Sequence, residues 1–456
     1  MAVAVAVGAV SVAAWLFVRY PGVLVSNVVN PDPKAHVDFE TFYRSSVALL
    51  HRADTYHTGS LLLNLNPPLL ALLLAPFGLL PATPAYWAFT ALSLAVMTLA
   101  VVLVARELRL GTGWTVLGVL TLWAGSPLHG TLVLGQIYGL LLLGVSLGWL
   151  AQRRGRPLLS AVLLGLVVAI KPSLAPLLLV PLVQRRPAPL WSGVLGAGVA
   201  TVVGVLAAGP SSALEWLKLA SGTPAPEVDA NASLPGVVSR LGGPGAVGWV
   251  LTVLVVAASL WWVRHAAPGT RAAPGRVGPA DAALFAVTAG CLLAAPIAWL
   301  NYTVLLWPGA LVLARAGRWR IAVPLLVVPV IPVAWGNLWQ AAPHTGWALL
   351  GRSLYCMVLL GYWVALLRMS ASTPGATAAE DGTEGGVNAT DPAGPGSEGA
   401  GFVAATGSSA GASVSGSPSS HNTPVGGTLS TADAGRPCHD SPVAHTAPRF
   451  PTPEPP

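Results

Sequence analysis

Apolar runs of membrane-spanning length follow one another along most of the chain. A helix needs about 20 apolar residues to cross the hydrocarbon core of a bilayer, with a range of about 17–25. Polar breaks delimit twelve candidate runs, several of them short: Ala2–Val18, Ala85–Ala105, Gly113–Leu128, Leu132–Ala151, Leu158–Ile170, Pro172–Val183, Leu190–Ala208, Ala246–Val263, Ala280–Pro296, Trp299–Ala314, Trp319–Trp335 and Gly346–Leu367. The pattern predicts an all-α polytopic membrane protein with about 12 transmembrane helices.

Two further segments lie between the first and second of these runs and do not fit a spanning helix. Pro67–Leu80 is apolar but has only 14 residues, so it is expected to be re-entrant or interfacial. Upstream, apolar residues recur at helical spacing from Asp38 to Leu50 and polar residues occupy the other positions. This pattern is typical of an amphipathic helix in the membrane interface. We therefore expect interfacial helices in the first outer loop.

The distribution of basic residues predicts the orientation. If Pro67–Leu80 does not cross, 14 Lys and Arg residues of the first 369 residues fall on one side of the membrane and eight fall elsewhere. The positive-inside rule places the basic side in the cytoplasm. Both termini are then expected in the cytoplasm, with residues 26–66 and 209–245 outside.

Acidic residues gather on the opposite side. Seven of the nine carboxylates before residue 370 fall in two outer loops: Asp32, Asp38, Glu40 and Asp54 in the first, and Glu215, Glu227 and Asp229 in the second. A channel or transporter would more often place such groups at mid-membrane, on its pathway. Carboxylates collected at one face favour chemistry or recognition there.

Composition separates the chain into two parts. Hydrophobic residues make up 54% and charged residues only 9% of the whole, against about 25% charged in ordinary soluble domains. Residues 1–369 are therefore assigned to the membrane domain. Residues 370–456 are rich in Gly, Ser, Ala and Pro, a composition that cannot bury enough surface to order itself, so a disordered cytoplasmic tail is expected. The net charge of +7 resides mainly in short loops, so no nucleic-acid partner is expected.

Asp38 is the first candidate for chemistry. It stands at the start of the interfacial helix, beside Phe39. One interpretation is an N-cap, because Asp is among the best capping residues. The other is a general base, which needs a carboxylate within reach of an acceptor hydroxyl in a partly desolvated cleft. Glu40 is the nearby rival, and on a helix it points about 200° away.

Other polar residues stand at the ends of apolar runs, each with a structural alternative. Lys171 precedes Pro172 at an expected outer end, where a lysine is either snorkelling or a cation for a phosphate. Asn231-Ala232-Ser233 has the pattern of a glycosylation acceptor, which is usually a chance match. Trp299 and Tyr302 fit an ordinary aromatic belt at the membrane interface.

Taken in order, these segments resemble the polyprenyl-phosphate-sugar-dependent glycosyltransferase 87 family, which has the GT-C membrane fold. The resemblance covers about residues 1–369. Its motifs are an acidic residue followed by aromatics, a Pro-Pro-Leu run, a Gly-Gln pair, a Lys-Pro break, an Asn-x-Ser motif with a downstream Arg, and a Trp-x-x-Tyr motif. Here these are Asp38–Tyr43, Asn66–Leu69 with Leu80-Pro81, Gly135-Gln136, Lys171-Pro172, Asn231 and Ser233 with Arg240, and Trp299 with Tyr302.

The resemblance implies a site at the outer face of a bacterial plasma membrane. The donor would be a polyprenyl-phosphate sugar and the acceptor a lipid or glycan, with no cofactor and no metal. Asp38 would be the catalytic base, and Lys171 and Arg240 would stabilise the departing phosphate. The remaining substrate-binding residues would be Glu40, Tyr43, Gln136, Asn231, Ser233, Trp299, Asn301 and Tyr302. Ala232 and Asn301 stand where the family often has Gln and His, and an Asn cannot shuttle a proton near neutral pH.

The function that the resemblance implies is an inverting hexosyltransferase reaction, with mannose as the first choice of sugar. The alternative is a lipid-linked-sugar transporter or flippase without transferase activity, which would also need a basic residue and a lipid-sized groove. A scaffold whose tail recruits cytoplasmic partners is a further alternative. The outer placement of the carboxylates favours the transferase.

Overall fold

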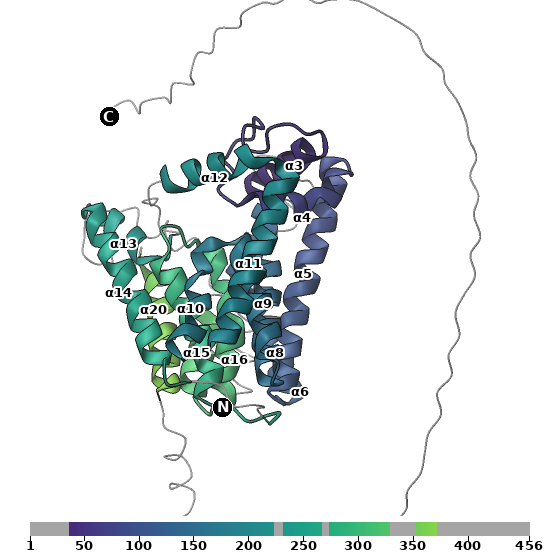
Figure 1. Cartoon of the computed structure of the whole chain (residues 1–456). Helices are drawn as coiled ribbons and strands as arrows, with labels where there is room; N and C mark the ends of the chain where they lie inside the picture. The colour runs from purple at the N-terminus through teal and green to yellow at the C-terminus, as the bar shows by residue number, and fades with distance from the viewer. Residues whose placement is uncertain (1–35, 223–230, 267–272, 329–352, 372–456) are drawn as a thin grey trace, which may run out of the picture. The chain divides into compact units, whose positions relative to one another are not determined.

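The structure is a computed structural model that describes residues 36–222, 231–266, 273–328 and 353–371. The chain divides into two compact units, Met1–Gly386 and Val387–Pro456, and every described residue belongs to the first. These residues form helices, with no strand among them (Figure 1). The expected span Ala2–Val18 and the expected disordered tail, apart from residues 370 and 371, lie outside the described residues.

The described helices follow the predicted order. They are α3 (Val37–Leu50), α4 (Pro68–Gly78), α5 (Ala82–Glu107), α6 (Thr112–Ala124), α7 (Ser126–Leu134), α8 (Tyr138–Arg153), α9 (Pro157–Ile170), η2 (Pro172–Leu174), α10 (Pro176–Val183), α11 (Pro187–Ala208), α12 (Pro210–Gly222), α13 (Leu234–Arg240), α14 (Gly245–Val263), α15 (Pro279–Ala294), η3 (Leu300–Leu306), α16 (Trp307–Arg315), α17 (Trp319–Val327) and α20 (Leu354–Ser370). The helices α12 and α13, in the second expected outer loop, were not predicted.

Few of these helices are long enough to cross a bilayer unaided. Three qualify by length and apolar composition, α5, α11 and α14, and the bent pair α6–α7 makes a fourth. Several other apolar helices are shorter, among them α9, α15 and α20. The all-helical, membrane-type architecture is therefore confirmed, whereas the number of about 12 spans stays a prediction.

One expected span is broken in the middle. The run Gly113–Leu128 was predicted as one helix, but α6 and α7 meet at an angle of 51°. Gly125 between them is extended, with ψ 128°, and Pro127 cannot donate a backbone hydrogen bond to continue the helix. His129 donates through Nε2 to the Trp123 carbonyl at 2.7 Å, which satisfies a carbonyl that the break exposes. Residues 132–134, expected in the next span, belong to α7 instead.

Two other expected spans begin with tight 3-10 turns instead of α-helix. Trp299–Ala314 consists of η3 followed by α16, and Pro172–Val183 consists of η2 followed by α10. Prolines mark these breaks, because each removes a backbone donor and disfavours the helical conformation of the residue before it. Such irregular backbone at membrane depth is tolerated only where protein or a water-filled cavity surrounds it.

The C-terminal end of α9 stops short of the C-terminal end of α11. Gly165 of α9 meets the backbone of Gly193 and Ala197 of α11, where a Cβ would overlap the Gly193 carbonyl oxygen. From that level α9 continues for only five residues, but α11 continues for eleven. At 1.5 Å per residue the difference is about 9 Å. Lys171, which follows α9 directly, therefore lies below the level at which α11 ends.

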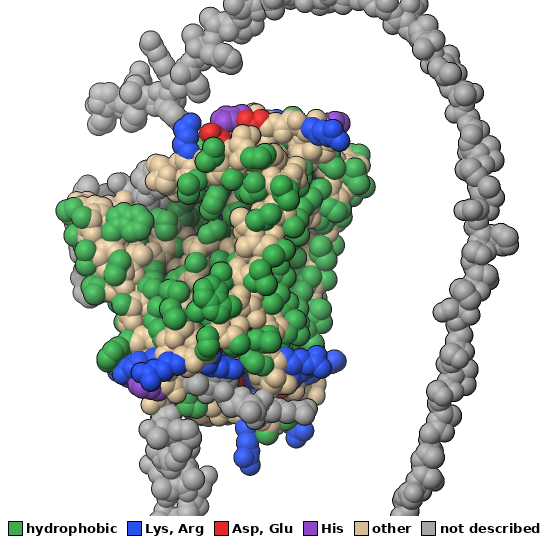
Figure 2. All heavy atoms as spheres, viewed as in Figure 1, with side chains coloured by type: hydrophobic (Ala, Val, Ile, Leu, Met, Phe, Trp, Pro, Cys, Tyr) green, Lys and Arg blue, Asp and Glu red, His purple; other side chains and the backbone are tan. Residues whose placement is uncertain are grey.

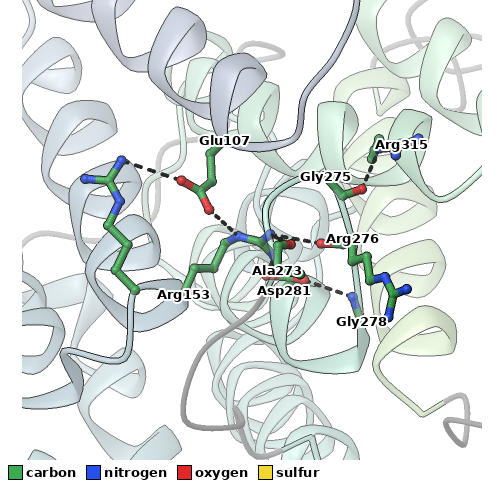
Figure 3. A network of polar contacts seen from close by, with 9 residues as sticks. Glu107, Arg153, Ala273, Gly275, Arg276, Gly278, Asp281 and Arg315 are labelled. Carbon is green, nitrogen blue, oxygen red and sulfur yellow. Dashed lines mark hydrogen bonds and ion pairs between the residues drawn. The ribbon is translucent and has the colours of Figure 1, made fainter. Parts of the chain in front are cut away.

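An ionic network ties helices together at the end of the bundle opposite α3 (Figure 3). The side chain of Arg153 is only 2% exposed and contacts Glu107 at 3.2 Å and Asp281 at 2.7 Å. It also donates to the carbonyls of Ala273 and Arg276. The connection between α14 and α15 is thereby fixed to α5 and α8.

Charged side chains on the visible surface gather at the two ends of the bundle (Figure 2). Lys and Arg side chains form a band near the end of the bundle where α6 begins, and the Asp and Glu side chains that stand out on this face lie at the other end, around α3 and α12, together with a few Lys, Arg and His side chains. Between these ends the visible face is largely apolar. The basic band at the end where α6 begins fits the predicted orientation, in which α3 is outside. The orientation itself stays a prediction.

Candidate functional site

Asp38 is placed by the first turn of α3 and by a contact across the fold. The helix begins at Val37 with His36 as its N-cap, and no side chain caps it. The Asp38 carboxylate instead accepts a hydrogen bond of 2.6 Å from Nε2 of Gln136. The N-cap interpretation of Asp38 is therefore wrong, because Asp38 is inside the helix and its carboxylate is turned toward another segment.

The backbone of Gly135 makes this contact possible. Gly135 ends α7 in the left-handed region, with φ 70° and ψ 46°, where residues with a Cβ are strained. A Cβ at this position would also overlap Cβ of Phe39. Only glycine satisfies both conditions, so α3 packs directly on the turn and the adjacent Gln136 reaches Asp38.

The surroundings of Asp38 favour a proton acceptor that works near neutral pH. Burial raises the pKa of the Asp38 carboxyl to about 6, while the Gln136 hydrogen bond and the positive charge of Lys171 act to lower it. Desolvation is the larger effect, because the hydration that the carboxylate loses on burial outweighs the stabilisation that one amide and one nearby cation provide. A base with a pKa near the working pH is well matched to proton abstraction.

A pocket of about 290 Å³ opens beside Asp38. It lies between α3, α7 and η3, and is lined by Val37, Asp38, Leu62, Ser126, Gly130, Leu134, Trp299, Leu300 and Asn301. Asn301 is 4% exposed, and its Nδ2 has no hydrogen-bond partner among the described residues. A buried donor without a partner is costly, so a ligand oxygen in this pocket would relieve that cost.

Lys171 stands over aromatic rings close to the same site. Its Nζ lies 5.4 Å from the ring centroid of Tyr302, and that ring stacks on Tyr138 with centroids 3.9 Å apart. Within the described part of the chain, no carboxylate oxygen lies within salt-bridge distance of Lys171. The snorkelling alternative is not supported, because the ammonium turns toward Tyr302 and Asp38 in the interior.

The predicted residues of the second outer loop form a clamp next to this pocket. Asn231 donates to the Pro296 carbonyl at 3.1 Å and accepts from the Ala298 amide at 3.0 Å. Ser233 caps α13 and also donates to Asn231. Nη1 of Arg240 donates to the Asn231 carbonyl at 2.8 Å. These hydrogen bonds hold the loop against the segment that leads to Trp299, which forms an isolated bridge with Asn231.

Glu40 and Tyr43 do not share the pocket of Asp38. Glu40 pairs with Arg44 at 2.7 Å, and the Tyr43 hydroxyl donates to the Leu80 carbonyl at 2.9 Å. Both residues line a separate pocket between α3 and the start of α5. The candidate residues thus separate into a group around Asp38, the clamp, and a group on another face of α3.

Some residues of the site were not predicted. Tyr138 begins α8 two residues after Gln136 and is 1% exposed, and Ser126 and Gly130 line the pocket from α7. The Ser126-Pro127 pair was a signal for the break that turns α7 toward η3. No group of three or more His, Cys, Asp or Glu residues suited to a metal ion occurs in the described ranges.

Comparison with known proteins relates the chain to membrane glycosyltransferases. An α-(1→3)-arabinofuranosyltransferase of Mycobacterium tuberculosis H37Rv is 32% identical over 181 residues, which is 38% of this chain and 41% of the relative. A polyprenol-phosphate-mannose-dependent α-(1-2)-phosphatidylinositol mannoside mannosyltransferase of the same strain is 26% identical over 62% of this chain and 71% of that protein. The chain thus spans about two fifths of the arabinofuranosyltransferase that it matches.

No solved structure matches the chain. The model of glycosyltransferase family 87 matches residues 64–296, which include Gly135, Gln136, Lys171 and the clamp residues Asn231, Ser233 and Arg240. The match covers about half of the sequence, and both relatives above are named as glycosyltransferases. The chain belongs to glycosyltransferase family 87, and its long apolar helices are those of a membrane protein.

Proposed function

We propose that this protein transfers a sugar from a polyprenyl-phosphate donor to a hydroxyl of a lipid or glycan acceptor at the outer face of the membrane, with Asp38 as general base. The observation that carries the proposal is the position of the Asp38 carboxylate. It is held by Gln136 at 2.6 Å, lines a pocket of about 290 Å³, and has a pKa raised to about 6 by burial.

The reaction needs one proton acceptor and one stabilised leaving group. The acceptor hydroxyl oxygen attacks the anomeric carbon and forms the new glycosidic bond, while its proton passes to the Asp38 carboxylate. The bond from the anomeric carbon to the phosphate oxygen breaks, and its electron pair leaves with the polyprenyl phosphate. Attack opposite the leaving group inverts the anomeric configuration. The negative charge develops on phosphate, where a cation stabilises the transition state.

Lys171 is the proposed partner of that phosphate. It lies below the level at which α11 ends, where we expect the phosphate of a donor lipid embedded in the bilayer, and no carboxylate of the described residues forms an ion pair with it. Arg240 is the proposed second cation, held by the Asn231 carbonyl. Trp299 and Asn301, whose Nδ2 has no hydrogen-bond partner among the described residues, line the pocket of Asp38, and we assign them to the transferred sugar.

Mannose is the first sugar to test and arabinofuranose the second. The mannosyltransferase relative covers the larger share of this chain, 62%, whereas the arabinofuranosyltransferase has the higher identity, 32%. The transporter alternative is not favoured, because the family and the relatives named above are transferases.

The proposal is tested with membranes that contain the protein, radiolabelled polyprenyl-phosphate mannose or polyprenyl-phosphate arabinose, and extracted acceptor lipids. We expect label in an acceptor product that the Asp38→Asn variant does not form. Lys171→Met should raise the donor concentration needed for half-saturation, and Lys171→Arg should restore part of the loss. If the wild type labels no acceptor with either donor, the proposed function is wrong.

A further inference from the structure

A second pocket, of about 340 Å³, lies on the other side of α3 from Asp38. Its wall on α3 includes His36, Glu40 and Tyr43, and the opposite wall includes Ala82 and Thr83 at the start of α5. Successive helix residues are rotated by about 100°. Asp38 therefore points about 200° away from Glu40, and the two pockets open on opposite sides of one helix.

The lining of this second pocket combines aromatic rings with hydrogen-bond acceptors. Phe39, Tyr43 and Tyr86 contribute ring surface. Oε1 of Glu40 accepts both bonds from Arg44, at 2.7 and 2.8 Å. Its other oxygen, Oε2, accepts no bond from a described residue. Apolar and aromatic walls with a few fixed polar groups are typical of small-molecule sites.

His36 adds a second acceptor. Its Nδ1 lies 2.5 Å from the Val133 carbonyl oxygen. A carbonyl only accepts, so Nδ1 carries the proton and Nε2 of the neutral ring is an acceptor. The residue is 3% exposed, and Nε2 has no partner among the described residues. The ring stacks on Tyr86, with centroids 3.8 Å apart. A ligand hydroxyl would supply the donor that Nε2 lacks.

We propose that this second pocket binds one sugar unit of the acceptor, and that this unit is not the one that receives the new sugar. Acceptors on Glu40 and His36 suit the hydroxyl donors of a sugar, and the aromatic rings suit its apolar face. The inference rests on the proposed function. A helix with its side chains is about 10 Å across, so one sugar cannot reach both Asp38 and this pocket. A glycan of several sugars is long enough to occupy both pockets at once.

The test fills the pocket without removing a polar group. Ala82 and Thr83 are exposed at its rim, so Ala82→Trp and Thr83→Trp would block it. Leu79→Trp is the matched control, because Leu79 is 74% exposed, lies close by in sequence and does not line the pocket. Initial rates are measured with octyl mannoside and octyl mannotrioside as acceptors, using the donor sugar that the wild type transfers. Thermal unfolding of each variant is recorded alongside.

We expect the wild type to use the trioside with a KM lower than that of the monosaccharide. Both blocking variants should raise the trioside KM about tenfold, the effect of losing about 1.4 kcal/mol of binding. Their monosaccharide KM, donor KM and unfolding temperature should match those of Leu79→Trp. If the wild type uses both acceptors with the same KM, this inference is wrong. It is also wrong if blocking the pocket raises both KM values equally. Neither result would contradict the proposed function. Absence of transfer even to extracted lipids would overturn the proposed function as well.

Discussion

The carboxylate of Asp38 and the amide of Gln136 meet at 2.6 Å although 98 residues separate them along the chain. The contact joins α3 to the turn between two other helices, α7 and α8. It fixes the direction of the Asp38 carboxylate, which would otherwise be free to rotate in the first turn of α3. Proton transfer requires such fixed geometry, so the pair is the centre of the site that we propose.

Replacing Asp38 with Asn separates catalysis from structure. The amide keeps the shape of the side chain and cannot accept the proton, so the rate of sugar transfer should fall about 10²–10⁴-fold, the usual contribution of general base catalysis. Asp54→Asn is the control, because Asp54 is an exposed carboxylate in the loop after α3 that is bonded to Tyr56 and His57. A radiolabel transfer assay at matched expression measures both. Asp38 is not the base if its Asn variant retains more than about a tenth of the wild-type rate.

The pH dependence follows from the raised pKa of Asp38. The base is active when ionised, so kcat/KM should increase tenfold per pH unit up to about pH 6 and then level off. Because the folded pKa is raised, ionisation of Asp38 destabilises the fold, and this loss of stability is complete above about pH 6. Asp38→Asn should therefore be at least as stable as the wild type at pH 7. A rate profile without an ascending limb near pH 6 would contradict the assignment.

Gly135→Ala should impair both stability and activity. The new Cβ is strained at φ 70° and overlaps Phe39, so α3 must move and take Asp38 away from Gln136. We expect a loss of about 1–3 kcal/mol in the free energy of unfolding. Gly113→Ala is the matched control, because nothing lies within 4 Å of its added Cβ. Denaturation in detergent and the transfer assay compare the two, and equal behaviour would show that the close packing is not needed.

Two adjacent arginines should differ strongly in their effect on stability (Figure 3). Arg153→Met leaves the buried carboxylates of Glu107 and Asp281 without their shared cation, and breaking such a network costs about 3–5 kcal/mol. Arg154 is 58% exposed and contacts Glu107 only at 3.5 Å, so Arg154→Met should cost less than about 1 kcal/mol. Thermal unfolding of the purified variants measures both. Similar losses for both would show that the network is not a structural tie.

The predicted orientation can be measured by labelling single cysteines with a membrane-impermeant maleimide in intact cells. The background carries Cys438→Ser, since Cys291 and Cys356 are buried. Ala53→Cys in the first outer loop should be labelled, and Thr112→Cys at the start of α6 should be labelled only after the cells are opened. Both positions are exposed. Labelling of Thr112→Cys in intact cells would reverse the orientation of the site.

The local part of the architecture could be predicted from the sequence. Apolar periodicity places most helices, and the length of Pro67–Leu80 separates the short α4 from the spans. These features depend on neighbouring residues alone. The bend at Gly125 and the 3-10 turn η3 at the start of the expected span Trp299–Ala314 were not predicted. Their prolines were visible, but whether a helix breaks depends on which groups elsewhere satisfy the freed backbone, as His129 does for Trp123.

For the site, the sequence supplied the candidates and the tertiary structure grouped them. Asp38, Gln136 and Lys171 could be selected from residue type and order, but their proximity depends on contacts between distant segments. Glu40, two residues from Asp38, was selected with it, yet helix geometry turns it into another pocket. Asn231 and Ser233 bond to each other and to the segment that leads to Trp299.

The sequence by itself therefore determined that this protein lies in a membrane, where most of its helices are and which side chains are candidates for chemistry, because hydrophobicity and helical period are local properties. Only the tertiary structure decided which of those side chains share a pocket and which of them are desolvated by burial. Desolvation and distance depend on every element packed around a group, and these two quantities set the pKa of Asp38 and the reach of Gln136.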